Sequence, residues 1–161
     1  MKIKTKDLSL VAIFAALYVA LVYVFSASSF LPQQFRVAGM LRPAIAKKWI
    51  LAIAYALGVI IANLFSPFAG IYDLLFMPMM SFVAGILGYA IALRFGKNYF
   101  ICGAIIATIV PLSLSWMFLQ LFNEPIIANF PLLLLGEQVV CLIGSSVFKM
   151  IESRFKWWET K

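Results

Sequence analysis

The sequence predicts an all-α integral membrane protein, a six-transmembrane-helix bundle with both termini cytoplasmic. The first observation is composition: 65% of the 161 residues are hydrophobic and 12% are charged, against roughly 45–50% and 25% in soluble domains. A soluble fold of this size could not bury so much apolar surface, so composition excludes a soluble enzyme and a free nucleic-acid-binding protein. The second observation is the length of the apolar runs, and the third is the placement of basic residues.

Long apolar runs directly predict five helices, at about 8–27, 49–66, 71–93, 98–121 and 130–150. A membrane helix needs about 20 apolar residues, so these runs account for most of the chain, and residues 1–161 are expected to form a single membrane domain. Residues 8–25 are longer than the apolar region of a typical signal peptide, which favours a retained membrane helix. Turn-rich residues at 66–70 and 123–125 separate neighbouring helices.

A sixth, short crossing is predicted at 33–46. Five helices would place the two basic ends of the chain on opposite sides of the membrane, which the positive-inside rule disfavours. At about 1.5 Å per residue the segment spans about 21 Å, less than the roughly 30 Å hydrocarbon core. Its neighbours must shelter it, because Arg36 and Arg42 are costly against lipid. Six crossings place most basic residues in the cytoplasm: Lys2, Lys4, Lys6, Lys47, Lys48, Arg94, Lys97, Lys149, Arg154, Lys156 and Lys161.

A stripe of small residues runs along the first predicted helix, where Ala12, Ala16 and Ala20 recur every four residues. Small side chains let another helix approach closely, which favours helix association in lipid. The stripe therefore indicates a docking surface for another subunit. The alternative is packing inside the bundle, because the same spacing recurs at 54/58/62 and 84/88/92.

Asp73 and Glu137 are the only acidic residues within the apolar runs. An ionised side chain in a membrane helix is costly, so each indicates a functional site. Asp73 follows a turn and could instead cap a helix. For Glu137 the alternative is a structural ion pair with Arg36 or Arg42.

Polar and aromatic residues gather at the predicted outer level of the bundle, which indicates a ligand pocket open to the outside. Arg36 is placed near this pocket, whereas Arg42, next to Pro43, is expected to reach the inner interface by snorkelling. The other residues expected at the outer level are Asn63, Trp116, Gln120 and Asn129.

The sequence contains no motif for catalysis, for a metal or for a cofactor. It has no histidine, which removes Ser–His pairs and the HExxH zinc motif, and it has neither a P-loop nor a GxGxxG pattern. Cys102 and Cys141 lie inside apolar runs and are expected to be small buried hydrophobes. The sequence therefore predicts a non-enzyme without a cofactor.

Three segments are similar to the QueT group of substrate-binding S components of energy-coupling factor (ECF) transporters. They are Phe-Arg-Val-Ala at 35–38, the stretch from Ile61 to Asp73, and Gly-Glu-Gln-Val-Val-Cys at 136–141. The similarity runs from about residue 8 to residue 150. One departure concerns the substrate: the family often has a glutamate after the arginine, where this chain has Ala38-Gly39-Met40-Leu41.

The resemblance implies a multi-pass protein of the plasma membrane that captures a small molecule outside. Its partners would be an ECF transmembrane coupling subunit, which docks on the alanine stripe, and two ATPase subunits. The implied ligand is a queuosine precursor, a 7-deazaguanine. Its paired N–H donors would meet Glu137, assisted by Asp73, with Asn63 beside them, Trp116 or Phe30 stacking on the ring, and Tyr72 and Arg36 completing the site. The alternatives are an S component for another vitamin or amino acid, and a membrane scaffold protein without a ligand.

Overall fold

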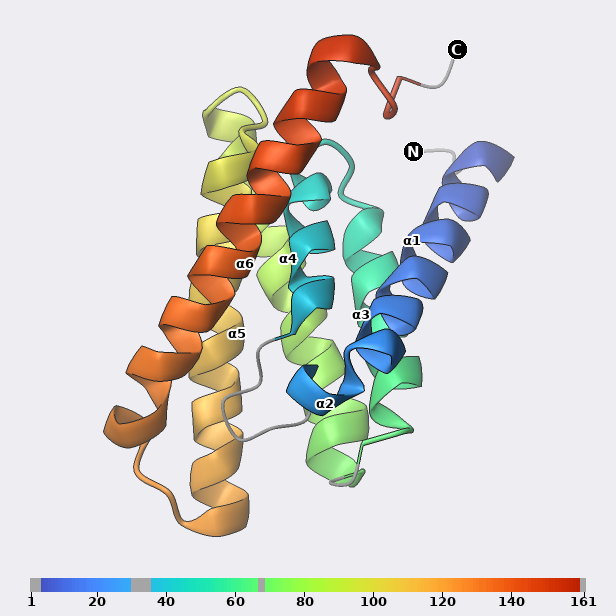
Figure 1. Ribbon diagram of the computed structural model, residues 1–161. Coiled ribbons are helices and arrows are strands. Elements are labelled where there is room, and N and C mark those ends of the chain that lie inside the picture. Colours follow the sequence, from blue (N-terminus) through green and yellow to red (C-terminus); the bar gives the residue numbers. More distant parts are fainter. Residues whose placement is uncertain (1–3, 30–35, 67–68, 160–161) are drawn as a thin grey trace.

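The structure, a computed structural model, describes residues 4–29, 36–66 and 69–159 and contains only helices in these ranges (Figure 1). Four helices are long and apolar enough to cross a membrane: the first, the last and the two between residues 72 and 122. The all-helical prediction is confirmed. The elements in chain order are α1 Thr5–Val24, α2 Ser26–Ser29, η1 Val37–Ala46, α3 Leu51–Asn63, η2 Tyr72–Phe76, α4 Met77–Arg94, α5 Tyr99–Phe122 and α6 Ile126–Arg154.

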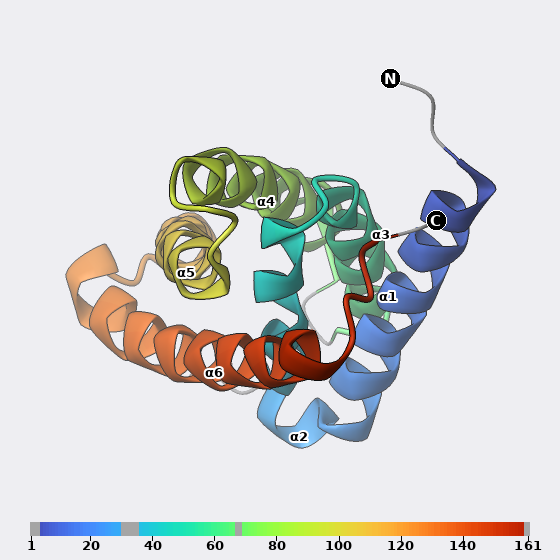
Figure 2. The same cartoon turned by 90° about the horizontal axis from the view of Figure 1, so that it is seen from above.

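The start of α1 and the end of α6 lie at the same end of the bundle, which we call the basal end (Figure 1). The distal end holds the end of α3, the start of α4 and the loop between α5 and α6. Viewed along the bundle, η1 lies in the centre (Figure 2) and packs against five helices, α1, α3, α4, α5 and α6. The other helices therefore shelter this short segment from the surroundings.

The central segment η1 is a 3-10 helix of ten residues. A short crossing was expected at 33–46, of which residues 33–35 lie outside the described residues. A 3-10 helix rises about 2.0 Å per residue and is narrower than an α-helix, and runs this long are uncommon. Pro43 lies inside it and cannot donate a backbone hydrogen bond. Packing is also close, because a Cβ at Gly144 of α6 would collide with the carbonyl oxygen of Met40.

A π-helical turn, η2, opens the helix that was expected at 71–93. The N–H of Met77 donates to the carbonyl of Tyr72, five residues earlier. Pro78 follows in the first turn of α4. Because proline has no N–H, the regular α-helical hydrogen bonding cannot continue across this point. Single π turns inside helices are frequent at functional sites, and this one carries one of the two acidic residues flagged above.

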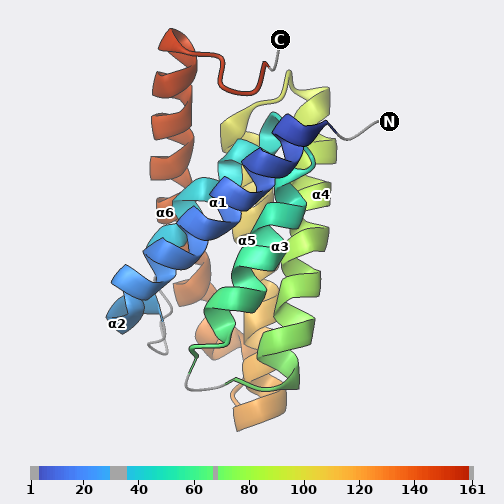
Figure 3. The same ribbon diagram turned by 90° about the vertical axis from the view of Figure 1, so that its right-hand side faces the viewer.

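Three stripes of small residues have the same four-residue spacing but different surroundings. The stripe of α1 is exposed along its length, at Ala12, Ala16 and Ala20. Figure 3 shows α1 crossing in front of α3 obliquely, with the side of α1 that faces the viewer uncovered. The stripes 54/58/62 of α3 and 84/88/92 of α4 are buried. Bundle packing therefore accounts for those two stripes, but not for the one on α1.

Two ion pairs join the basal ends of the helices to the loop after η1. Lys47 Nζ lies 2.8 Å from Glu152 Oε1 at the end of α6, and Lys48 Nζ lies 2.6 Å from Asp7 Oδ1 at the start of α1. Lys47 also lies over the ring of Trp158, 4.6 Å from its centre. Cations beside aromatic rings are typical of the membrane interface.

Candidate functional site

Asn63 and Asp73 form a buried polar pair at the distal end. The Asn63 side chain is completely buried, and 3% of Asp73 is exposed. The Asn63 amide donates to the carboxylate Oδ1 of Asp73 at 3.1 Å and to the backbone carbonyl of the same residue at 2.8 Å. Asp73 thus ties the π turn to the end of α3. The backbone donor that a helix-capping role would require is absent from its hydrogen bonds among the described residues.

The carbonyl oxygen of the Asn63 side chain has no hydrogen-bond partner among the described residues, although it is buried. A buried acceptor without a partner costs roughly 1–3 kcal/mol. Such an atom is a place where a ligand donor would be stabilising. The carboxylate of Asp73 also has spare capacity, because an ionised carboxylate offers about four lone-pair sites.

The π turn that carries Asp73 also carries two aromatic residues, which form a cluster with Trp116. The rings of Tyr72 and Trp116 are 6.0 Å apart between centres, and those of Phe76 and Trp116 are 4.8 Å apart. Tyr72 and Phe76 stand four residues apart in η2, so they share one helix face. Trp116 on α5 is 39% exposed. Sequence reasoning included Tyr72 and Trp116 but missed Phe76, which the four-residue spacing from Tyr72 signals.

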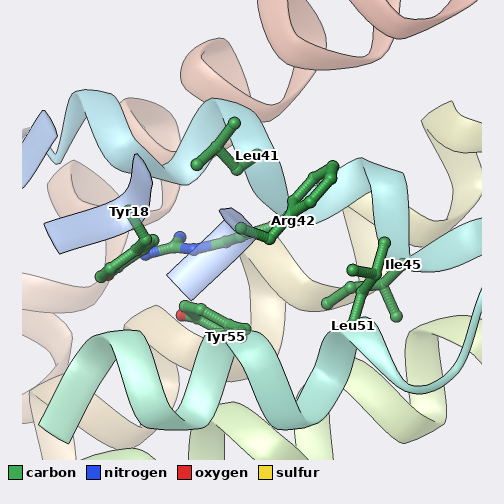
Figure 4. A pocket seen from close by; sticks show the side chains of 7 residues that line it. Tyr18, Leu41, Arg42, Ile45, Leu51 and Tyr55 are labelled. Carbon is green, nitrogen blue, oxygen red and sulfur yellow. The ribbon is translucent and has the colours of Figure 1, made fainter. Parts of the chain in front are cut away.

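Arg42 and Glu137 form an ion pair inside the bundle that joins η1 to α6. Only 2% of Arg42 and 6% of Glu137 are exposed. The guanidinium lies beside Tyr18 and above Tyr55 (Figure 4), 5.1 Å from the centre of the Tyr55 ring. The expectation that Arg42 snorkels to the inner interface is wrong. Its side chain turns into the bundle because an internal carboxylate compensates its charge there.

Arg36 is also buried, at the start of η1, and its Nε donates to the carbonyl oxygen of Ser29 at 3.4 Å. It therefore connects η1 to the short helix α2 across the segment between them. Phe30, the alternative stacking residue, lies outside the described residues.

The structure divides the expected site into separate groups. Among the described residues, no hydrogen bond or ion pair joins the Asn63–Asp73 pair to the Arg42–Glu137 pair. Two other residues expected at the outer level do not take part in either pair. Gln120 is exposed on α5, and the Asn129 amide donates to the Glu124 carboxylate at 2.7 Å near the exposed α5–α6 loop.

A cavity of about 310 Å³ lies between the distal ends of α1 and α3. It is lined by Val19, Val22, Tyr23, Ser26, Ala62 and Phe65. Asn63 and Asp73 are not among the residues that line it. Its volume is at the lower end of the roughly 300–1,000 Å³ of small-molecule sites. The sequence did not indicate this cavity, because its lining is mainly apolar and comes from segments far apart in the chain: α1, the start of α2, and the end of α3 with the residues after it.

Four apolar helices of membrane length, packed around a buried central segment, define a multi-pass membrane protein. Its distal end holds buried polar groups, which in a membrane protein indicate function. The chain belongs to the QueT transporter family, because the family model described as QueT transporter matches residues 8–153. The resemblance found in the sequence is thereby confirmed, and the family makes the protein a transporter rather than an enzyme. Comparison with curated proteins finds no match, and comparison with solved structures finds none either.

Proposed function

We propose that this protein is the substrate-binding S component of an ECF-type importer. The observation that carries the proposal is the exposed stripe Ala12–Ala16–Ala20, which lies on the uncovered side of α1. In lipid there is no hydrophobic drive between helices, so association depends on close packing. A smooth exposed stripe is suited to a partner helix, and the occupant we propose is the transmembrane coupling subunit, itself bound to two ATPase subunits.

The proposed topology has six crossings with both termini in the cytoplasm. It is supported by the common basal position of the start of α1 and the end of α6 (Figure 1), and by the lysines at that end. Single cysteines at Lys48 and Asn123, in a chain lacking Cys102 and Cys141, should label from opposite sides of the membrane. Labelling of both from one side would exclude this topology.

The proposed ligand is a queuosine precursor of the 7-deazaguanine type, bound at the distal end. The Watson–Crick edge of such a base presents adjacent N–H donors and one carbonyl acceptor. The Asp73 carboxylate and the unpartnered carbonyl oxygen of Asn63 would accept the donors. Trp116 and Tyr72 would stack on the ring, a contact that is worth roughly 1–3 kcal/mol per base.

We assign Glu137 a positioning role in this proposal, through its ion pair with Arg42. The pair fixes η1 against α6. Arg36 directly precedes η1, where the chain enters this segment from the distal end. Direct contact between Glu137 and the ligand, expected from the sequence, stays as the alternative role. Arg36 would help to hold the start of η1 against α2.

The experiment that tests the proposal is purification of the full chain together with its partners, followed by mass spectrometry of released small molecules. Co-purification of a coupling subunit and ATPase subunits with a bound 7-deazaguanine supports it. Release of a vitamin or an amino acid would support the S-component role but would mean that the ligand is not a 7-deazaguanine. A chain that retains neither ligand nor ATPase subunits would be a membrane scaffold protein.

Ala16→Trp tests the docking surface. An indole in the middle of the stripe prevents close helix approach, so co-purification of the coupling subunit should fall at least tenfold while ligand binding stays unchanged. The matched control is Ala90→Trp, because Ala90 is an exposed alanine on α4, outside the stripe. Normal assembly of Ala16→Trp would place the docking surface elsewhere.

A further inference from the structure

A small basic pocket lies at the basal end, remote from the distal site. It has a volume of about 150 Å³ and lies where the α4–α5 loop meets the end of η1 and the last turns of α6. Three lysines line it, together with one carboxylate and two phenylalanines: Lys47, Lys97, Lys149, Glu152, Phe95 and Phe100.

The charge balance of the pocket favours an anion. The ammonium of Lys47 is already engaged, because it pairs with the only acidic residue of the lining, Glu152, at 2.8 Å. Lys97 and Lys149 come from different elements, and neither has a carboxylate partner within 4.0 Å in the described part of the chain. Two positive charges therefore face one cavity without compensation.

The backbone holds Lys97 in a defined place. Gly96 and Lys97 both have positive φ angles, 67° and 59°. The N–H of Lys97 donates to the carbonyl of Ala92 and closes α4, while the Asn98 side chain accepts from the N–H of Phe100 and caps α5. The loop is therefore fixed at both ends, and the first turn of the 24-residue α5 adds a positive dipole end to the lysine charges.

The size and rim of the pocket select the kind of anion. A cavity of about 150 Å³ is smaller than the roughly 300–1,000 Å³ that enclose a whole small molecule, so part of the ligand must lie outside it. Phe95 at the rim is 60% exposed, and Lys149 lies over the ring of Phe100, 5.8 Å from its centre. An exposed ring and a half-buried ring beside lysines match the boundary between headgroups and acyl chains.

We propose that this pocket binds the phosphate group of an anionic phospholipid. The phosphate oxygens would accept from Lys97 and Lys149, and the acyl chains would run along Phe95 into the bilayer. Basic pockets between membrane helices bind anionic headgroups in this way. The same phosphate chemistry could come from a free phosphate ion, but a free ion would make no use of the apolar rim.

Native mass spectrometry of the full-length protein, in detergent with phosphatidylglycerol or phosphatidylcholine, tests the proposal. The test variant is Lys97→Gln/Lys149→Gln, and the charge-matched control is Arg154→Gln/Lys156→Gln, which removes two basal cations outside the pocket. Each lysine near an anionic lipid contributes about 1 kcal/mol, or roughly fivefold, so the test variant should bind phosphatidylglycerol roughly 30-fold more weakly. The control should bind it as the unchanged protein does.

Three results would overturn the proposal. Equal weakening in both variants would mean general charge attraction. Equal retention of the two lipids, which carry the same phosphate group, would mean that the pocket does not select an anionic headgroup over a zwitterionic one. The third result is that millimolar inorganic phosphate displaces phosphatidylglycerol and that glycerol phosphate binds as tightly as the lipid. Together these two observations would identify the pocket as a site for a free anion. A thermal unfolding profile equal to that of the control shows that the test variant is folded.

Discussion

The Asn63–Asp73 pair and the Arg42–Glu137 pair both place a carboxylate inside an apolar bundle, but their surroundings differ. In the part of the chain that the structure describes, the distal pair has a buried acceptor without a partner, and its Asp73 shares the π turn with Tyr72, whose ring contacts Trp116 at the surface. The central pair joins opposite charges between η1 and α6, next to Tyr18 and Tyr55. Among the described residues both arrangements keep a buried polar atom without a hydrogen-bond partner, Asn63 Oδ1 in the first and Arg42 Nε in the second, but only in the second does an opposite charge compensate the carboxylate.

The comparison teaches that an acidic residue in an apolar run does not by itself indicate a binding site. Burial of a charge requires compensation, which can come from another side chain or from a ligand. Glu137 has its partner within the chain, in Arg42. Asp73 accepts from a neutral amide, so a further donor from outside would still be stabilising.

The largest expected effect is that of Glu137→Gln. This change leaves the Arg42 charge buried without compensation, which lowers the free energy of unfolding by about 3–5 kcal/mol. Unfolding of the purified protein in detergent measures it. The control is Glu159→Gln at the exposed Lys156–Glu159 pair, where the loss should be no more than about 1 kcal/mol. Equal stability of the two variants would contradict the role assigned to the central pair.

A double variant, Arg42→Met/Glu137→Met, sharpens this test. Replacing both members of a buried ion pair by apolar residues of similar volume is often neutral or stabilising, so the double variant should recover most of the lost stability. If apolar packing holds η1 in place as the ion pair does, the double variant should also bind ligand. A folded double variant that does not bind would show that the charged pair itself is needed for binding.

Asp73→Asn is expected to have the next largest effect, on affinity rather than on stability. The substitution replaces one acceptor oxygen of the side chain by an N–H donor, which would face the donors of the ligand. Loss of a charged hydrogen bond costs roughly 2–3 kcal/mol of binding free energy, or about 30- to 150-fold in affinity. Calorimetric titration with a 7-deazaguanine measures it. Asp7→Asn makes the same chemical change at the basal end and should leave affinity unchanged. An unchanged affinity of Asp73→Asn would remove the distal pair from the site.

Trp116→Leu should have the smallest of these effects. It removes ring stacking but keeps an apolar side chain, so affinity should fall by about 1–2 kcal/mol, or roughly 5- to 30-fold. The same titration measures it, with Trp158→Leu at the basal end as the control. A loss as large as that of Asp73→Asn would mean that stacking matters as much as hydrogen bonding.

Much of the fold could be predicted because the thickness of the membrane sets the length of the hydrophobic runs, and the preference of basic residues for the cytoplasmic side sets the distribution of lysines. The sequence also singled out both buried carboxylates, since ionised groups are rare in such runs. The side chains that these carboxylates contact could not be predicted from the sequence. Glu137 and Arg42 are 95 positions apart, and only the packing of η1 against α6 brings them together. Asn63 and Asp73 are only ten positions apart, and the hydrogen bond between them spans a single turn of the chain.

The 3-10 form of η1 and the π turn η2 were not predictable from hydrophobic patterning. Periodicity reports which face of a helix is apolar, but both segments are short and apolar on nearly all sides. Their geometry depends on prolines and on close packing, as Pro43 and Gly144 illustrate for η1. The snorkelling expected of Arg42 failed for a related reason, because a single sequence does not show that an internal carboxylate is within reach.

The two basal ion pairs have a mechanical consequence. The adjacent residues Lys47 and Lys48 fasten the loop after η1 to the last turn of α6 and to the first turn of α1, at 2.8 Å and 2.6 Å. The basal end is thus fastened by two ion pairs, whereas the distal end of α1 continues into the four-residue α2, whose Ser29 carbonyl accepts a hydrogen bond from Arg36. The first turn of α1, the loop after η1 and the last turn of α6 are therefore held together by charge, so a motion that separates these three segments must break both ion pairs.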